Sequence, residues 1–188
     1  VADYILSQQK GNTVSNLSSS RALADVTVQH GGQYQAGAVG EVNVVSKMKE
    51  IGAVIGGEGN GGIIYPTSHY GRDALVGIGL FLTHLALNGK KCSELRQQYP
   101  SYFMSKNKIE LTPQINTDAL LVAMKEKYKN ERVTDIDGVK IDFAESWVHL
   151  RKSNTEPIIR IYSEAKSPEA ANLLALKMIA EIKEVAGI

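Results

Sequence analysis

The sequence is almost free of cysteine, since Cys92 is the only one in 188 residues. Disulfide frameworks and cysteine-based metal clusters are therefore excluded, and a reducing compartment, the cytoplasm, is expected. No apolar run reaches the length of a transmembrane helix, so we expect no membrane insertion. The formal net charge is only +1, which removes the broad positive surface that binding to nucleic acids or anionic membranes requires. Any anion site must therefore be local.

What is present is an ordinary globular composition, with 43% hydrophobic and 22% charged residues. The length allows one large domain or two of ordinary size. The chain begins at Val1 inside a helix-like pattern, VADYIL, and we therefore expect it to be a piece of a longer protein.

The first half alternates helix and strand signals, which predicts an α/β domain with a mixed sheet and helices on both faces. Helices are expected at residues 2–9, 21–30, 41–51 and 73–87, and strands at residues 13–17, 34–39 and 54–56. The helix capped by Asp73 has one continuous apolar face, made of Leu75, Ile78, Leu82 and Leu85.

The second half is typical of a smaller α+β domain with an antiparallel sheet. A type I′ hairpin is predicted about Asp137-Gly138, with further strands at residues 147–152 and 158–164. Helices are expected at residues 116–129 and after Ser167-Pro168, the last with a buried stripe of Leu174, Met178, Ile182 and Val185. Residues 101–113 are polar and irregular. The boundary is therefore placed near 104–112, between domains of residues 1–105 and 110–188.

A glycine-rich loop, GGEGNGG, raises the first question about function. Its glycines match G-x-G-x-x-G, but residues 63–66 (IIYP) follow where a dinucleotide site needs a helix. Glu58 would also repel a phosphate at close range. A flexible turn that presents Glu58 and Asn60 suits hydroxyl groups better than phosphates.

A second segment, RKSNTEPIIR, combines guanidinium groups, hydroxyls and a turn between two strands. These are the donors that phosphate recognition uses. Local chemistry leaves two interpretations open, a phosphate site or a polar hairpin turn with solvated charges. The candidate phosphate ligands are Arg151, Ser153, Asn154 and Thr155, with Lys152 and Arg160 close by in the sequence.

Other potential sites are weaker. The spacing Asp135-x-Asp137 suggests a cation, but the residues that should complete an EF-hand loop are absent and a hairpin turn is favoured. The four histidines, His30, His69, His84 and His149, lack metal-ligand spacing and are expected to be structural or exposed. No catalytic triad can be argued from the spacing.

The two loops, in this order, resemble the C-terminal half of the α-D-phosphohexomutases, the family of phosphoglucomutase, phosphomannomutase and phosphoglucosamine mutase. GGEGNGG is similar to the sugar-binding loop of the third domain, and RKSNTEPIIR is similar to the phosphate-binding loop of the last. The segments NLSSSRAL, AVGEVNVVSKM and HYGRDAL also resemble the third domain. The resemblance covers residues 1–105 as that domain and 110–188 as the fourth.

This resemblance implies a role for each loop. Glu58 and Asn60 would bind ring hydroxyls of a hexose phosphate or hexose bisphosphate, and the loop from Arg151 to Thr155 would bind its phosphate. In the family the reactive phosphoserine and Mg²⁺ lie in two preceding domains. No catalytic residue or metal is therefore expected in this chain, which alone would be inactive, and the missing N-terminal domains are expected partners. The alternative is a stand-alone sugar-phosphate-binding module.

Two positions depart from the family pattern. Gly62 stands where the family carries a histidine, and Val42 stands where it commonly carries a basic residue. The roles of those two side chains cannot be transferred to this chain. Both loops are shared by enzymes acting on glucose, mannose and glucosamine phosphates, so they do not select among these sugars.

Overall fold

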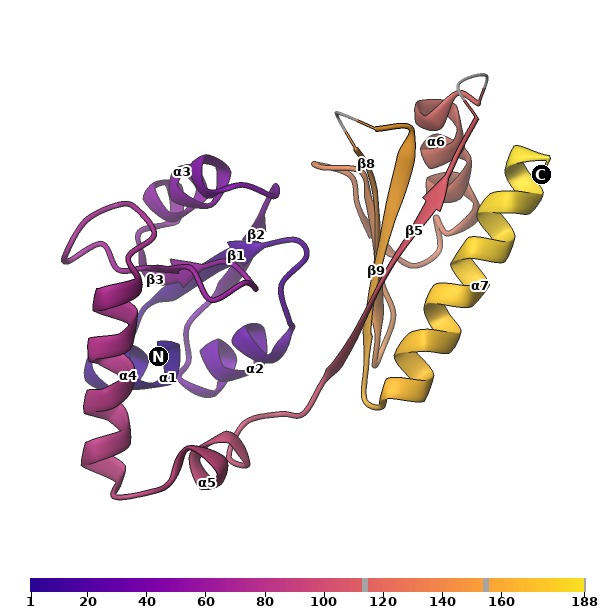
Figure 1. Ribbon diagram of the computed structural model, residues 1–188. Helices are drawn as coiled ribbons and strands as arrows, with labels where there is room; N and C mark the ends of the chain where they lie inside the picture. The colour runs from indigo at the N-terminus through magenta and orange to yellow at the C-terminus, as the bar shows by residue number, and fades with distance from the viewer. Residues whose placement is uncertain (113–114, 154–155, 188) are drawn as a thin grey trace. The chain divides into compact units, whose positions relative to one another are not determined.

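The computed structural model describes residues 1–112, 115–153 and 156–187, which form two compact units, Val1–Ser101 and Tyr102–Ile188 (Figure 1). The second unit opens with strand β5 (Phe103–Glu110), which fills most of the stretch where the sequence suggests a boundary. The division thus falls at 101/102, and residues 102–105 belong to the second unit. Strand β5 lies at the edge of its sheet, and Ile109 is its only buried side chain. Its other residues are therefore mostly polar, which is why the sequence of this segment resembles that of a loop.

The first unit contains a mixed four-stranded sheet in the order β2-β1-β3-β4. Its strands are β1 (Asn12–Asn16), β2 (Tyr34–Gly37), β3 (Ala53–Gly57) and β4 (Ile63–Ile64). The first three are parallel, and β4 runs antiparallel to β3. The predicted mixed sheet is therefore confirmed, although the sequence reading missed β4, which is only two residues long.

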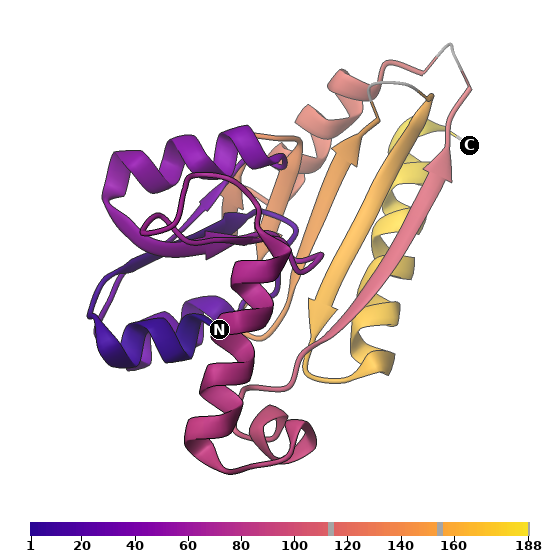
Figure 2. The ribbon, with the colours of Figure 1, turned by 60° about the vertical axis from the view of Figure 1, so that its left-hand side comes forward.

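Helices cover both faces of this sheet, as predicted. Helix α3 lies on one face, and α1 and α2 lie on the other (Figures 1 and 2). The five helices of the unit are α1 (Ala2–Gln8), α2 (Ala22–Gln29), α3 (Glu41–Ile51), α4 (Ala74–Asn88) and α5 (Cys92–Arg96). Asp73 caps α4 by accepting from the Val76 amide at 2.9 Å, and left-handed Gly52 and Gly89 end α3 and α4.

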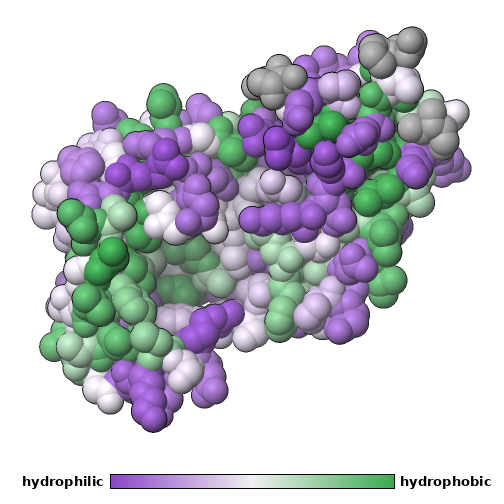
Figure 3. Space-filling model, in the orientation of Figure 1, coloured by the Kyte–Doolittle hydropathy of each residue, from purple (hydrophilic) through white to green (hydrophobic). Residues whose placement is uncertain are grey.

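The predicted apolar face of helix α4 is largely exposed rather than buried. Its buried residues are Gly77 and His84, whereas Leu75 is 81% exposed and Ile78 and Leu82 are each 54% exposed. Figure 3 shows the resulting hydrophobic surface over this helix. The helix turns this way because Gly77 packs closely on Ile63 and His84 joins a polar network. No helix among the described residues combines the length and apolar character needed to cross a membrane.

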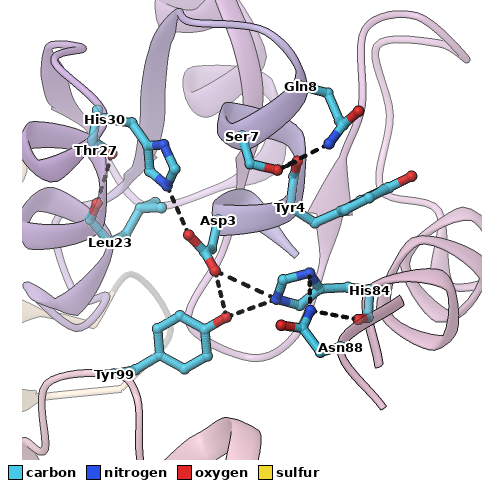
Figure 4. Close-up of polar contacts among 10 residues, drawn as sticks. All are labelled: Asp3, Tyr4, Ser7, Gln8, Leu23, Thr27, His30, His84, Asn88 and Tyr99. Atoms are coloured by element: carbon cyan, nitrogen blue, oxygen red, sulfur yellow. Dashed lines mark hydrogen bonds and ion pairs between the residues drawn. The ribbon is translucent and has the colours of Figure 1, made fainter. Parts of the chain in front are cut away.

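That network joins α1, α2 and α4 to the segment after α5 (Figure 4). Nε2 of His30 lies 2.7 Å from one oxygen of Asp3, and the Tyr99 hydroxyl donates to the other at 2.8 Å. Nε2 of His84 lies 3.0 Å from the Tyr99 hydroxyl, and the Asn88 amide donates to the His84 carbonyl at 2.8 Å. One carboxylate thus links helices that are distant in sequence.

We expect Asp3→Asn to destabilise the first unit at neutral pH. Burial alone would raise the pKa of the Asp3 carboxyl, but hydrogen bonds from His30 and Tyr99 hold it below its ordinary value. The contribution to stability is therefore present above a pH of about 4, the unfolded pKa, and is lost as the pH falls through the folded value. The free energy of unfolding at pH 7 should drop by about 1–2 kcal/mol, a range that allows for partial exposure of the group.

Urea unfolding followed between pH 2 and 7 measures this effect. Glu50→Gln is the control, because Glu50 pairs with Lys47 on the exposed surface of α3. Between pH 7 and pH 2, the free energy of unfolding should fall less in Asp3→Asn than in Glu50→Gln, because the variant no longer has the Asp3 carboxylate to protonate. Identical profiles for the two variants would show that the network does not stabilise the unit.

The second unit is a five-stranded antiparallel sheet in the order β5-β9-β8-β7-β6, as the predicted α+β class requires. Strands β6 (Arg132–Thr134), β7 (Val139–Asp142), β8 (Trp147–Lys152) and β9 (Ile158–Ala165) complete it. Helices α6 (Thr117–Lys127) and α7 (Pro168–Ala186) cover one face (Figure 1). Met178 and Ile182 on α7 pack on Ile141 and Ile161 of the sheet core, whereas Val185 is 42% exposed.

The β6–β7 connection is longer than the predicted type I′ turn. The last pair before the loop is Thr134 with Lys140. A type I′ turn needs a positive φ at both central residues. Gly138 has a φ of 72°, but no non-glycine residue in the described ranges has a positive φ, so Asp137 does not fit.

Candidate functional site

The glycine loop connects β3 to β4 as a tight hairpin. The Glu58 amide donates to the Gly62 carbonyl at 2.9 Å, and the Gly61 amide donates to the Glu58 carbonyl at 3.1 Å. A Cβ on Gly57 would lie 2.3 Å from the Gly62 carbonyl oxygen, so the close approach of the two strands requires glycine. The loop is followed by a strand rather than by the helix that the dinucleotide fingerprint requires, so the dinucleotide interpretation is excluded.

The Glu58 carboxylate is held rather than solvated. Its side chain is only 7% exposed. The Asn16 amide donates to Oε1 at 2.9 Å, and Nη1 of Arg72 lies 3.2 Å from Oε2. Asn16 is itself fixed, because its Oδ1 accepts from the Ser18 amide and the Ser19 hydroxyl. A carboxylate has about four acceptor positions, so each oxygen keeps capacity for a ligand hydroxyl.

Asn60 has a different role in the loop. It is exposed, and its Oδ1 accepts from the Gly62 amide at 3.2 Å. This bond stabilises the turn, so any contact with a ligand falls to the side-chain NH₂ group.

A hollow of about 190 Å³ opens beside the loop, at the ends of the parallel strands. It is lined by Ser15, Ser19, Ser20, Ile55, Glu58 and other residues of the first unit. Ligand pockets typically measure roughly 300–1,000 Å³. This hollow can therefore enclose only part of a sugar phosphate.

The second candidate segment connects β8 to β9. Arg151 lies at the end of β8, where its Nε is 3.3 Å from Oδ2 of Asp137. The Ser153 amide donates to the Ile158 carbonyl at 3.0 Å, which closes the base of the loop. Asn154 and Thr155 lie outside the described residues.

A row of three cations crosses the sheet beside this loop. Lys108 on β5 is opposite Arg160 on β9, and Arg160 is opposite Arg151 on β8. Ile159 and Ile161 belong to the core under the helices, so Arg160 between them points to the other face.

The register of this row makes it a candidate anion site. Like charges directly opposite on neighbouring strands destabilise a sheet. Asp137 partly compensates Arg151, and Glu110 pairs with Lys108 at 3.1 Å. Within the described ranges no carboxylate pairs with Arg160. A bound anion would relieve this repulsion.

Sequence reasoning missed several of these residues. Lys108 joins the row only through the pairing of β5, which the sequence did not predict. Asn16 and Arg72 reach Glu58 from 42 and 14 positions away in the sequence. Both lie in segments that resemble the family, NLSSSRAL and HYGRDAL, but the sequence did not indicate that they contact Glu58. The carboxylate spacing at Asp135 and Asp137 is explained by ion pairs, because these residues contact Lys125 and Arg151.

No metal site is visible in the ranges 1–112, 115–153 and 156–187, which contain no cluster of three His, Cys, Asp or Glu side chains suited to an ion. Of the remaining histidines, His69 lies 3.0 Å from Asp73 and His149 lies 2.6 Å from the Asp137 carbonyl. Burial lowers the pKa of His149, so this imidazole is neutral at pH 7.

Two family models match this chain, and both describe domains of the same family of proteins. The profile "Phosphoglucomutase/phosphomannomutase, alpha/beta/alpha domain III" matches residues 1–102, and "Phosphoglucomutase/phosphomannomutase, C-terminal domain" matches residues 109–181. The chain belongs to the phosphoglucomutase/phosphomannomutase family. Its two units correspond to the third and the C-terminal domains of these proteins.

Individual relatives agree with this assignment. The chain is 36% identical over 185 residues to a phosphoglucomutase/phosphomannomutase of Thermococcus kodakarensis, covering 96% of this chain and 41% of the relative. It is 36% identical over 174 residues to a phosphoglucosamine/phosphogalactosamine mutase of Sulfurisphaera tokodaii, covering 90% and 38%. The chain thus spans about two fifths of the length of these relatives.

A solved structure shares the fold. It is the crystal structure of a phosphoglucomutase/phosphomannomutase family protein from Burkholderia thailandensis, with a TM-score of 0.79 and 23% identity. The match covers 98% of this chain and 40% of that one.

The cation row predicts phosphate binding that depends on both arginines. We expect inorganic phosphate to shift the Ser153 amide resonance of the chain, and Arg151→Ala and Arg160→Ala each to weaken this binding about tenfold. The effect should fall as salt is added, because the row is partly exposed.

NMR titration of the three proteins measures these affinities. The control is Arg132→Ala, which removes an exposed arginine from strand β6 at the opposite edge of the sheet. Shifts at Ser153 that survive in both variants would mean that the anion binds elsewhere, or that the segment is only a turn.

Proposed function

We propose that this chain is the substrate-recognition half of a phosphohexomutase, an enzyme that interconverts hexose 1-phosphate and hexose 6-phosphate through a bisphosphate intermediate. The names of the relatives support the class of reaction. The observation that carries the recognition role is the Glu58 carboxylate, which is 7% exposed, fixed by two donors and set in a glycine loop.

The reaction explains why a fixed carboxylate is useful. A sugar phosphate that exchanges its two ends must bind in two opposite orientations. A carboxylate accepts hydroxyl hydrogens from either orientation, because its acceptor positions are chemically equivalent. The loop also leaves open space at Gly61, where a Cβ would meet nothing within 4 Å. We assign Glu58, with the NH₂ group of Asn60, to the hydroxyls of the sugar.

The second unit is assigned to the phosphate that is not reacting. Arg151 and Arg160 supply guanidinium groups, and Ser153 supplies a hydroxyl at the start of the loop. Asn154 and Thr155 complete the proposed phosphate ligands on the resemblance of the motif alone. A guanidinium binds phosphate through two parallel hydrogen bonds, which fixes orientation as well as charge.

The chemical step is assigned to other parts of the parent protein. The chain matches two domains of a family whose members are more than twice as long. The described residues offer no carboxylate cluster that fits a Mg²⁺ ion. We propose that the phosphoryl donor and Mg²⁺ belong to the N-terminal domains, that the enzyme is cytoplasmic, and that this chain alone has no mutase activity.

The alternative proposal is a stand-alone module that binds sugar phosphates without catalysis. Both proposals use the same residues, so ligand binding does not distinguish them. The coding sequence upstream of Val1 distinguishes them. A serine loop and an aspartate-rich metal loop encoded there would identify the parent enzyme, whereas a start codon immediately before Val1 would identify the module.

Replacing Glu58 tests the recognition role. Glucose 1-phosphate should shift the amide resonances of residues 57–62, and Glu58→Gln should weaken this binding by about 10- to 100-fold, because hydrogen bonds to a charged acceptor are lost. Glu94→Gln is the matched control, since Glu94 accepts from the Lys91 amide at the start of α5. Equal affinity of the two variants would remove Glu58 from the site.

A further inference from the structure

Arg72 occupies a fixed position beside the glycine loop. It forms an isolated antiparallel bridge with Ile64 of β4. The next residue, Asp73, donates its amide to the Ile63 carbonyl at 2.8 Å and caps α4. The backbone of Arg72 is therefore held between a strand and a helix start, and only its side chain is adjustable.

The Arg72 side chain crosses directly over Gly62. A Cβ at position 62 would lie 2.6 Å from Cδ and 3.1 Å from Cγ of Arg72. Gly62 is not among the glycines with positive φ, so its backbone conformation does not require glycine. What Gly62 provides is the space through which the arginine side chain passes.

Beyond Gly62 the guanidinium bridges two carboxylates. Nε donates to Oε2 of Glu41 at 2.7 Å, the Arg72 amide donates to Oε1 at 3.1 Å, and Nη1 lies 3.2 Å from Oε2 of Glu58. Glu41 is the first residue of α3, so it anchors the guanidinium from a different element. The hydrogen bonds from Arg72 lower the pKa of the Glu41 carboxyl, which keeps this anchor charged at neutral pH.

We propose that Arg72 is the positioning residue for Glu58 and that Gly62 is required for it to reach the carboxylate. This inference rests on the proposed role of Glu58 in binding sugar hydroxyls. Asn16 fixes one carboxylate oxygen and Arg72 fixes the other, so the remaining acceptor positions have a defined direction. Without the arginine, Glu58 would keep one neutral donor, and its neighbour Glu41 would be an uncompensated negative charge.

Gly62→Ala should therefore have the same effect as deleting the arginine. The added methyl group meets the flexible stem of Arg72 rather than backbone, so the side chain moves away and the fold is kept. The matched control is Gly79→Ala on α4, where a Cβ meets nothing within 4 Å. Arg96→Ala, which removes an arginine near Tyr99, controls for the loss of one positive charge.

The first measurement needs no ligand. The Nε–H resonance of Arg72 should exchange slowly with solvent in the unmodified chain and in Gly79→Ala, because it is bonded to Glu41. It should exchange rapidly in Gly62→Ala. Slow exchange in Gly62→Ala would overturn the proposal, whatever the chain binds.

The second measurement is the affinity for glucose 1-phosphate, read from the Glu58 and Gly59 amide resonances. Arg72→Ala and Gly62→Ala should each weaken binding about tenfold, and the double variant should be no weaker than either, because both remove one interaction. Arg72→Lys, which keeps the charge, and added methylguanidinium in Arg72→Ala should each restore part of the affinity. The same concentration of sodium chloride should not.

These outcomes distinguish a failure of the positioning role of Arg72 from a failure of the proposed function. Additive effects of the two substitutions, or no rescue by lysine and methylguanidinium, would overturn the positioning role of Arg72. Absence of any glucose 1-phosphate effect in the unmodified chain would contradict the proposed function, while the exchange of the Arg72 Nε–H would still decide whether Gly62 gives the arginine access.

Discussion

The candidate site is built around the ion pair between Glu58 and Arg72. An almost buried carboxylate is costly unless it is paired and hydrogen-bonded. Here the Arg72 guanidinium and the Asn16 amide meet that requirement from two different elements of the first unit. Two glycines of the loop have separate structural reasons, because Gly57 allows the strands to approach and Gly62 leaves the space that the Arg72 side chain occupies. A loop whose glycines first suggest a dinucleotide site is thereby a candidate site for hydroxyls.

The second unit presents the opposite electrostatic situation. The face of its sheet opposite the helices carries Lys108, Arg160 and Arg151 in register across three strands. Like charges in register do not stabilise a sheet, and Asp137 and Glu110 compensate only Arg151 and Lys108, which makes the row a candidate anion site. One unit thus offers a fixed acceptor and the other offers concentrated donors, and the proposed function assigns these two kinds of group to the hydroxyls and the phosphate of a sugar phosphate. The formal net charge of +1 indicates neither the acidic group nor the basic row, because both are local features of the chain.

Local signals in the sequence predicted much of the fold. Helix α3 has the predicted bounds because Gly52 adopts a left-handed conformation at its end, and β8 also has the predicted bounds. What failed depends on contacts between distant residues. Strand β5 reads as a loop until β9 pairs with it, and the exposed face of α4 follows from the bonds of His84 to Tyr99. The motif indicated Glu58, and HYGRDAL contains Arg72, but the contact between the two side chains is recognisable only in three dimensions.

The role of Glu58 is best examined by comparing glucose 1-phosphate with glucose 6-phosphate in NMR titrations of the same chain. If Glu58 serves both orientations of the sugar, both isomers should shift the Glu58 and Gly59 amides, with affinities within about tenfold of each other, a difference of about 1.4 kcal/mol. Shifts with only one isomer, or shifts that leave these two amides unchanged, would contradict the claim that one fixed carboxylate recognises both ends of the reaction.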